Sequence, residues 1–104
     1  MGRRTWPAGE PPREKLVRFG VRQLSDAELL AVLLGTGAAG LDAVALSHQL
    51  LARSGGLRDL LVADRTTCLR LRGLGPARWC RLQAALELAR RHYEQVLRAR
   101  PLLD

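Results

Sequence analysis

The stretch RLRGLGPARW, residues 70–79, places two glycines around a leucine and follows them with a proline. Glycine adopts backbone angles closed to other residues and lets another group approach closely. Pro76 suits the first turn of a helix, because the amide that it lacks has no partner there anyway. The N–H groups of Gly75, Ala77 and Arg78 would then lie at a helix N-terminus, whose partial positive charge suits an anion. The pattern predicts a phosphate-binding site made of backbone amides, which we call the phosphate hook.

Three roles are expected within this hook. The glycines and Ala77 would act through backbone amides, Leu74 would fix the turn in the core, and arginines would neutralise phosphates. The predicted nucleic-acid-binding residues are Arg72, Gly73, Leu74, Gly75, Ala77, Arg78 and Arg81. Because no polar side chain is placed to read a base edge, the expected binding is sequence-independent. The competing interpretation is a structural turn with a glycine cap.

The charge of the chain is strongly basic and unevenly spread. Its 104 residues carry 17 basic and 10 acidic side chains, a net charge of +7, and Lys15 is the only lysine. Residues 24–63 hold two basic and four acidic residues, whereas residues 64–104 hold nine basic and four acidic ones. A basic balance favours nucleic acid, an anionic surface or an acidic protein as partner, and a merely solvated arginine-rich face is the plain alternative.

The composition predicts a small all-α domain of five to six helices. Leucine, alanine and valine dominate the 47% of hydrophobic residues, and aromatic residues make up only 4%. Such residues favour helices, whereas strands draw on β-branched and aromatic ones. We expect a flexible arm over residues 1–11, a helical domain over 12–97 with the hairpin motif at 65–91, and a disordered tail or linker over 98–104. No long apolar run indicates a signal peptide or membrane span, so a cytoplasmic location is expected.

Local signals predict where the helices begin and end. A first helix runs over residues 12–19, and a second begins with the capping-box pair Ser25 and Glu28 and ends at Gly35. Further helices are expected over residues 42–53, 57–63, 64–71 and 76–97. On the last of these, one face holds Trp79, Leu82, Leu86, Ala89 and Tyr93. This phase favours Trp79 as a core residue over a base-stacking one.

A weak internal repeat relates the two halves of the chain. Gly35-Thr36-Gly37 matches Gly73-Leu74-Gly75, 38 residues later, and Asp26 then matches Asp64. The match suggests two helix–turn–helix units packed as a pseudo-dimer. The first hairpin has a polar middle residue and no arginine around it, so it is expected to serve packing rather than to contact DNA.

Other chemistries find little support in the residues. Cys68 and Cys80 are both expected to be small buried groups, since no second pair completes a zinc site. His48 and His92 stand alone, and no nucleophile–base set or Walker-type loop is evident. No cofactor is predicted, and a monovalent cation in the hairpin is left open.

Two stretches of the sequence resemble known families. LRGLGPARWCRLQAALELARR resembles a helix-hairpin-helix motif, and PREKLVRFGVRQLSDAELLAVLLGTG resembles the opening of the RadC family, bacterial proteins labelled as DNA repair factors. GGLRDLLVA follows in that family's order, so the resemblance covers about residues 12–91. It implies a module that grips double-stranded or branched DNA without sequence preference, near the nucleoid, in repair or recombination.

The sequence departs from the RadC pattern at two points. RadC proteins usually continue into a JAB/MPN-type domain, similar to zinc metallopeptidases, with a His-x-His pair, and this sequence stops at Asp104 before one. We therefore expect no enzymatic activity from these residues. Trp79 also stands where the family more often has a small residue. The alternative function is a protein-interaction or dimerisation module that regulates or delivers a JAB/MPN domain, with Leu41 or Val44 in the contact.

Overall fold

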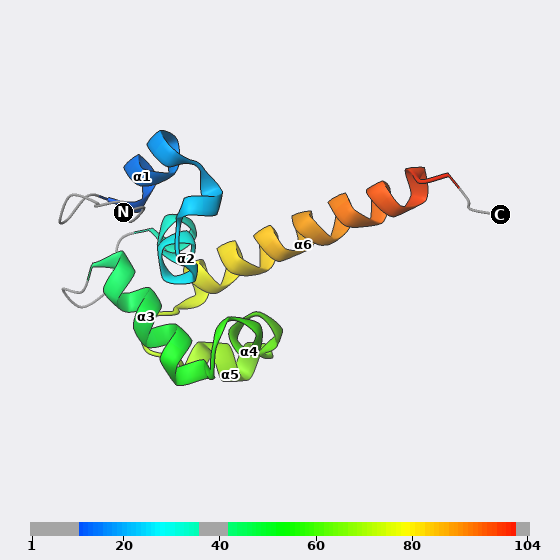
Figure 1. Ribbon diagram of the computed structural model, residues 1–104. Helices are drawn as coiled ribbons and strands as arrows, with labels where there is room; N and C mark the ends of the chain where they lie inside the picture. The colour runs from blue at the N-terminus through cyan, green and yellow to red at the C-terminus, as the bar shows by residue number, and fades with distance from the viewer. Residues whose placement is uncertain (1–10, 36–41, 102–104) are drawn as a thin grey trace.

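The computed structural model describes residues 11–35 and 42–101, and within these ranges every regular element is a helix. In chain order they are α1 (Pro12–Phe19), the short 3-10 helix η1 (Val21–Gln23), α2 (Asp26–Leu34), α3 (Ala43–Ser54), α4 (Leu57–Val62), α5 (Arg65–Arg70) and α6 (Pro76–Ala99). The first five α-helices lie around the N-terminal part of α6, and the rest of α6 projects away from them (Figure 1). The predicted all-α class is confirmed.

The helix ends follow the caps that the sequence predicts. Both hydrogen bonds of the capping box are formed: the Glu28 amide donates to Ser25 Oγ at 3.1 Å, and the Ser25 amide donates to the Glu28 carboxylate at 2.9 Å. Asp42 precedes α3 and Asp64 precedes α5 as N-caps. The last helix ends at Ala99, two residues later than expected. Its end is set by Pro101, because the residue before a proline is driven out of the helical conformation.

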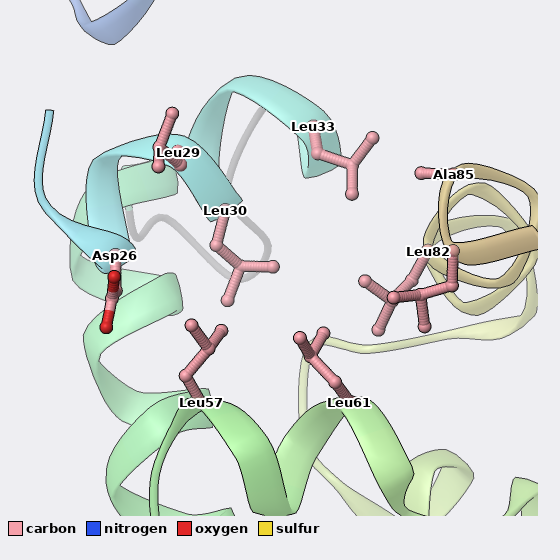
Figure 2. A pocket seen from close by; sticks show the side chains of 9 residues that line it. Asp26, Leu29, Leu30, Leu33, Leu57, Leu61, Leu82 and Ala85 are labelled. Carbon is pink, nitrogen blue, oxygen red and sulfur yellow. The ribbon is translucent and has the colours of Figure 1, made fainter. Parts of the chain in front are cut away.

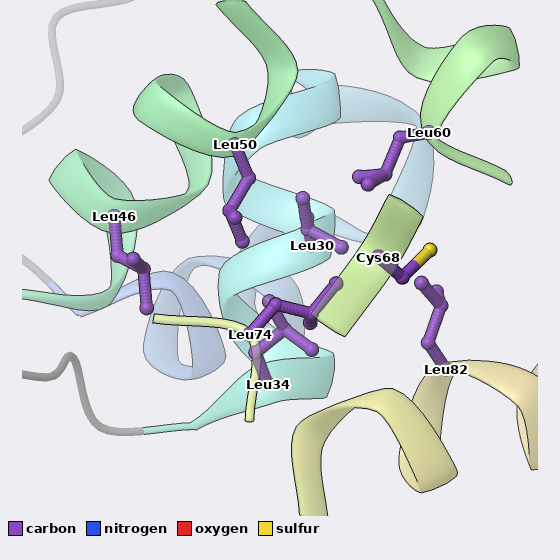
Figure 3. Packing of buried hydrophobic residues seen from close by; sticks show 8 residues of the cluster. All are labelled: Leu30, Leu34, Leu46, Leu50, Leu60, Cys68, Leu74 and Leu82. Atoms are coloured by element: carbon purple, nitrogen blue, oxygen red, sulfur yellow. The ribbon is translucent and has the colours of Figure 1, made fainter. Parts of the chain in front are cut away.

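The core is almost entirely leucine. Its buried members are Leu30, Leu34, Leu46, Leu50, Leu60, Cys68, Leu74 and Leu82, which come from α2 to α6 and from the hairpin (Figure 3). Fully burying one such side chain stabilises the fold by about 1.5–3 kcal/mol relative to exposure. Leu74 is only 1% exposed, so the hairpin is anchored in the core as predicted.

An ion pair ties α1 to α2. The ammonium group of Lys15, the only lysine, is buried and donates to the carboxylate of Glu28. The same carboxylate accepts the Ser25 amide, so one side chain serves both the cap and the contact with α1. Burial alone would raise the pKa of Glu28, but the hydrogen bonds from Lys15 and Ser25 and the charge of Lys15 lower it further than burial raises it.

One expectation about α6 needs correction. Cys68 is buried as expected, but Cys80 is exposed, because on a helix it lies about 160° around the axis from Leu82. Ala89 and Tyr93 share the face of Leu82 but lie beyond the body of the domain, and Tyr93 is 64% exposed.

Some sequence-based expectations fall outside the described residues. These are the arm up to residue 10, residues 36 and 37 of the first hairpin, Leu41, and the tail after residue 101.

Candidate nucleic-acid interface

The hairpin between α5 and α6 has the predicted shape. Gly73 has a φ of 91°, and the Leu74 amide donates to the Leu71 carbonyl at 3.1 Å. Gly75 is extended and acts as the N-cap of α6, with Pro76 in the first turn. The Trp79 amide then donates to the Gly75 carbonyl at 2.9 Å and starts the helix. The turn therefore leads directly into α6, and the first backbone amides of that helix lie next to the hairpin.

The two glycines of the hairpin are there for different reasons. A Cβ at Gly73 would meet Leu46 Cδ1 at 2.3 Å, and the positive φ also favours glycine, so the fold itself needs Gly73. Gly75 has an ordinary φ of −74°, and a Cβ there would meet nothing within 4 Å. The fold does not need a glycine at this position. Because glycine has no side chain, the N-cap of α6 makes no side-chain hydrogen bond to the helix.

The N-terminus of α6 differs from those of α3 and α5. Asp42 accepts the Ala45 amide at 2.7 Å at the start of α3, and Asp64 accepts the Thr67 amide at 2.8 Å at the start of α5. In α6 the N-cap makes no side-chain hydrogen bond, and the first turn holds no acidic residue. The first amides of a helix have no intrahelical acceptor. At α6 the N-cap residue supplies no side-chain acceptor for them, and the helix dipole favours a negative acceptor there.

The three predicted arginines lie at or near the hairpin, but their side chains make different contacts. Arg78 donates to the Gly73 carbonyl at 3.4 Å and so braces the turn. Arg81 donates to the Leu34 carbonyl at 2.8 Å, at the C-terminal end of α2, where a cation is favourable. Arg72 is exposed on the turn itself. Arg81 is exposed as well, but one of its guanidinium nitrogens is engaged with Leu34, so Arg72 is the exposed arginine of the three that stands on the turn itself.

Sequence reasoning missed two further arginines beside the hairpin. Arg70 ends α5 and is exposed, and Arg65 at its start places its guanidinium 5.9 Å from the centre of the Trp79 ring. Trp79 itself packs against the core cluster, which confirms its predicted role. The available signal was the run of arginines at 65, 70 and 72, which a helix as short as α5 keeps close to the turn.

The two helix–turn–helix units hold each other through their glycines. Leu46 of α3 packs on Gly73 of the second unit, while Arg81 of α6 reaches the end of α2, 3.4 Å from a Cβ placed at Gly35. These contacts are reciprocal: each unit's second helix meets the other unit's first glycine. Two similar units packed together would give this pattern, and the pseudo-dimer suggested by the internal repeat stays a prediction because residues 36–41 lie outside the described residues.

Other candidate chemistry is weak across the described residues. Burial raises the pKa of the Cys68 thiol, the Asp64 charge adds to the rise, and Trp79 opposes it, so the thiol is a poor nucleophile. Within residues 11–35 and 42–101, no group of three or more metal-ligating side chains comes together. No helix in the same ranges is long and apolar enough to cross a membrane.

Comparison with known proteins gives a consistent match. The family model described as UPF0758 N-terminal matches residues 4–80. A UPF0758 protein of Azotobacter vinelandii is 56% identical over this whole chain, which covers 46% of that relative. One of Shewanella baltica is 58% identical over 91 residues, or 88% of this chain and 40% of the relative. One of Pseudomonas fluorescens is 53% identical over the whole chain, again 46% of the relative.

The chain thus spans less than half the length of these curated relatives. No solved structure matches it. The resemblance to the RadC N-terminal region is consistent with the family match, which extends from residue 4 through the hairpin glycines and into the first turns of α6. With a family model over most of its length and relatives above half identity along it, the chain belongs to the UPF0758 family.

Proposed function

We propose that this chain is a sequence-independent DNA-binding module that holds the phosphate backbone at the N-terminus of α6. One observation carries the proposal. Acidic side chains cap α3 and α5, whereas α6 begins with Gly75, has no side-chain cap and has no acidic residue in its first turn. A phosphate oxygen can accept the amides that this arrangement leaves, and the helix dipole adds to the attraction.

The surroundings of the hairpin support the same function. Exposed arginines at 65, 70 and 72 lie within ten residues of Gly75 along the chain, which carries a net charge of +7. Arg78 covers the Gly73 carbonyl, an oxygen that would otherwise repel a phosphate. Leu74 holds the turn in the core, so the amides are ordered before a ligand arrives. Backbone amides and arginines of this kind would bind phosphates and would not distinguish base edges.

The strength of binding should depend steeply on salt. A contact with about three phosphates releases counterions in proportion and weakens roughly 40-fold between 50 and 200 mM salt. We expect this slope with duplex and branched DNA of unrelated sequences, measured by fluorescence anisotropy of labelled DNA.

The sharpest variant is Gly75→Asp, which gives α6 the cap that Asp42 gives α3. The carboxylate would accept the first amides and repel phosphate, so DNA affinity should fall by at least about tenfold, while the better cap keeps the fold stable. Gln95→Glu is the matched control, because it adds the same charge on an exposed position of α6 far from the hairpin.

The outcomes are distinct. A loss of affinity in Gly75→Asp with near-normal affinity in Gln95→Glu supports the hook. Equal affinity in all three proteins, or no salt-dependent binding by the natural sequence at 50 mM salt, would rule it out. The alternative, a protein-interaction module with Leu41 or Val44 in the contact, stays a prediction: Leu41 lies outside the described residues, and Val44 is half-buried on α3.

A further inference from the structure

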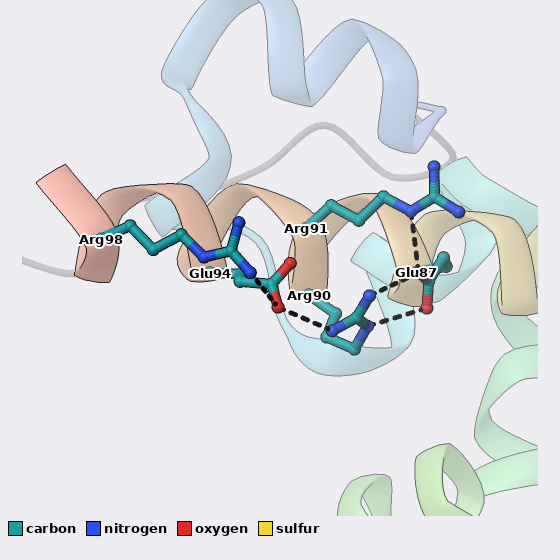
Figure 4. A network of polar contacts seen from close by, with 5 residues as sticks. All are labelled: Glu87, Arg90, Arg91, Glu94 and Arg98. Carbon is teal, nitrogen blue, oxygen red and sulfur yellow. Dashed lines mark hydrogen bonds and ion pairs between the residues drawn. The ribbon is translucent and has the colours of Figure 1, made fainter.

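The part of α6 beyond the domain body has one fully charged side. Glu87 accepts from Arg90 at 2.9 and 3.0 Å and from Arg91 at 2.8 Å. Glu94 lies 3.8 Å from Arg90 and 3.5 Å from Arg98. These residues satisfy one another along one side of the helix (Figure 4). This side is built to face water.

The opposite side carries an apolar seam, made of Leu82, Leu86, Ala89, Tyr93 and Val96. Their spacing alternates between four and three residues, which is the spacing of a helix-pairing seam. The seam starts in the core, where Leu82 is buried and Leu86 packs against the core cluster. It continues into solvent, where Tyr93 is 64% and Val96 43% exposed.

An apolar pocket opens at the inner end of the seam. It is a cavity of about 210 Å³ between α2, α4 and α6, and Figure 2 shows leucines of all three helices turned toward it. One charged side chain, Asp26 from the start of α2, stands among the lining residues. The pocket and the seam are continuous, since Leu82 and Leu86 belong to both.

We propose that a second copy of this chain covers the seam, with the two α6 helices antiparallel and centred near residue 91. This register sets Leu86 against Val96 of the second copy and Ala89 against its Tyr93, so that a large side chain always meets a small or medium one. A parallel pair would set the two Tyr93 side chains against each other. It would also bring both domain bodies, which lie at the N-terminal part of α6, to the same end.

Charge complementarity supports the antiparallel register. Arg100 follows Val96 on the seam side, just past the end of α6, where an arginine is out of place in an apolar contact. Antiparallel pairing brings it level with Leu82 of the other copy, next to the pocket that Asp26 lines. Each copy thus offers one acidic and one basic partner, as a two-fold contact requires.

This pairing goes beyond the proposed DNA binding and stands without it. The apolar overlap runs only from residue 86 to residue 96 of each α6, about three turns, so we expect a weak dimer with a dissociation constant on the order of 10 µM. The two hairpins would lie roughly 50 Å apart along the helices and stay open to solvent.

Sedimentation velocity of the 104-residue chain from 1 µM to 1 mM tests the proposal. We expect a monomer–dimer equilibrium that Tyr93→Glu weakens on the order of 30-fold, while Gln95→Glu, which lies off the seam and adds the same charge, leaves it unchanged. Asp26→Arg and Arg100→Asp should each weaken the dimer, and the double variant should restore it.

Far-ultraviolet circular dichroism confirms that each variant is folded. A monomer at every concentration would overturn the proposal and leave the seam to another occupant, such as the part of the longer relatives that this chain does not cover. A dimer that Tyr93→Glu leaves intact, or charge reversals that the double variant fails to rescue, would overturn it as well. DNA binding by a monomeric chain would leave the proposed function standing while this inference falls.

Discussion

The two connections that carry a Gly-X-Gly sequence, at residues 35–37 and 73–75, lead into helices with different N-caps. After α2, the chain enters α3 through Asp42, whose carboxylate accepts the Ala45 amide in the first turn of the helix. After α5, it enters α6 through Gly75, which has no side chain to accept an amide. One residue at the N-cap decides whether a helix end is closed by the protein or left for an anion. The comparison teaches that the glycine pattern alone does not make a phosphate hook.

The largest effect should come from Gly73→Ala. Its Cβ would overlap buried Leu46, and its φ of 91° is unfavourable for alanine. We expect a loss of about 3 kcal/mol in the free energy of unfolding. Gly35→Ala should cost about 1 kcal/mol, because its φ of 80° is also positive but the nearest atom, on Arg81, is 3.4 Å away. Urea unfolding of both variants measures the difference, and equal losses would contradict the account.

Glu28→Gln should have the second largest effect on the free energy of unfolding, since it removes a carboxylate that contacts a buried ammonium group. Glutamine keeps the capping box but removes the negative charge that the buried ammonium of Lys15 contacts on α2. We expect a loss of about 2–3 kcal/mol at pH 7. The pKa of Glu28 is lowered in the folded protein, so its contribution is present above its ordinary pKa of 4.5 and disappears as pH falls through the lowered value.

The free energy of unfolding, measured at pH 7 and near pH 3, checks the direction of the Glu28 pKa shift. The natural protein and Glu28→Gln should differ less at the lower pH, and a difference that grows there would be inconsistent with a lowered pKa.

Exchanging the caps sharpens the comparison directly. Asp42→Ala should cost about 1 kcal/mol, because α3 loses its N-cap, whereas Gly75→Asp should stabilise the fold by about 0.5 kcal/mol, because α6 gains one. Urea unfolding at low salt measures both. A destabilised Gly75→Asp would mean that the fold, rather than a ligand, requires the glycine.

The smallest effect is expected on the outer part of α6. Hydrogen bonds from Arg90 and Arg91 lower the pKa of Glu87 to about 2, yet all three side chains are substantially exposed. Glu87→Gln should therefore change stability less than any variant above, and 1 M salt should remove most of the change. Carboxyl titration by NMR should find the low pKa in the natural protein, and a value near 4.5 would show that the network does not form in solution.

Helix ends and the hairpin could be predicted because their signals are local. Ser25, Asp64 and Pro76 each act on residues within a few positions, and the structure has them in the expected roles. The function of Arg81 could not be foreseen, since its carbonyl partner lies 47 residues away and depends on how the two units pack.

The apolar seam on α6 is a second feature that the sequence predicts only in part. Periodicity placed Leu82, Ala89 and Tyr93 on one face, but where the domain body stops along α6 depends on tertiary packing. Cys80 was misjudged for a simpler reason: composition favours buried cysteines, whereas the helical phase sets this one opposite Leu82. Features that depend on neighbouring residues could be predicted from the sequence, whereas contacts between distant segments could not.

The most direct measurement is an NMR titration of the isotope-labelled chain with a short DNA duplex, following backbone amides. The account predicts that the largest shifts fall on the amides of Gly75, Ala77 and Arg78 and shrink as salt rises from 50 to about 200 mM. The Ala45 amide, which donates to the Asp42 carboxylate, should stay still. Shifts centred on the start of α3, or on the outer part of α6 with the hairpin unmoved, would contradict the claim that the open end of α6 holds the phosphate.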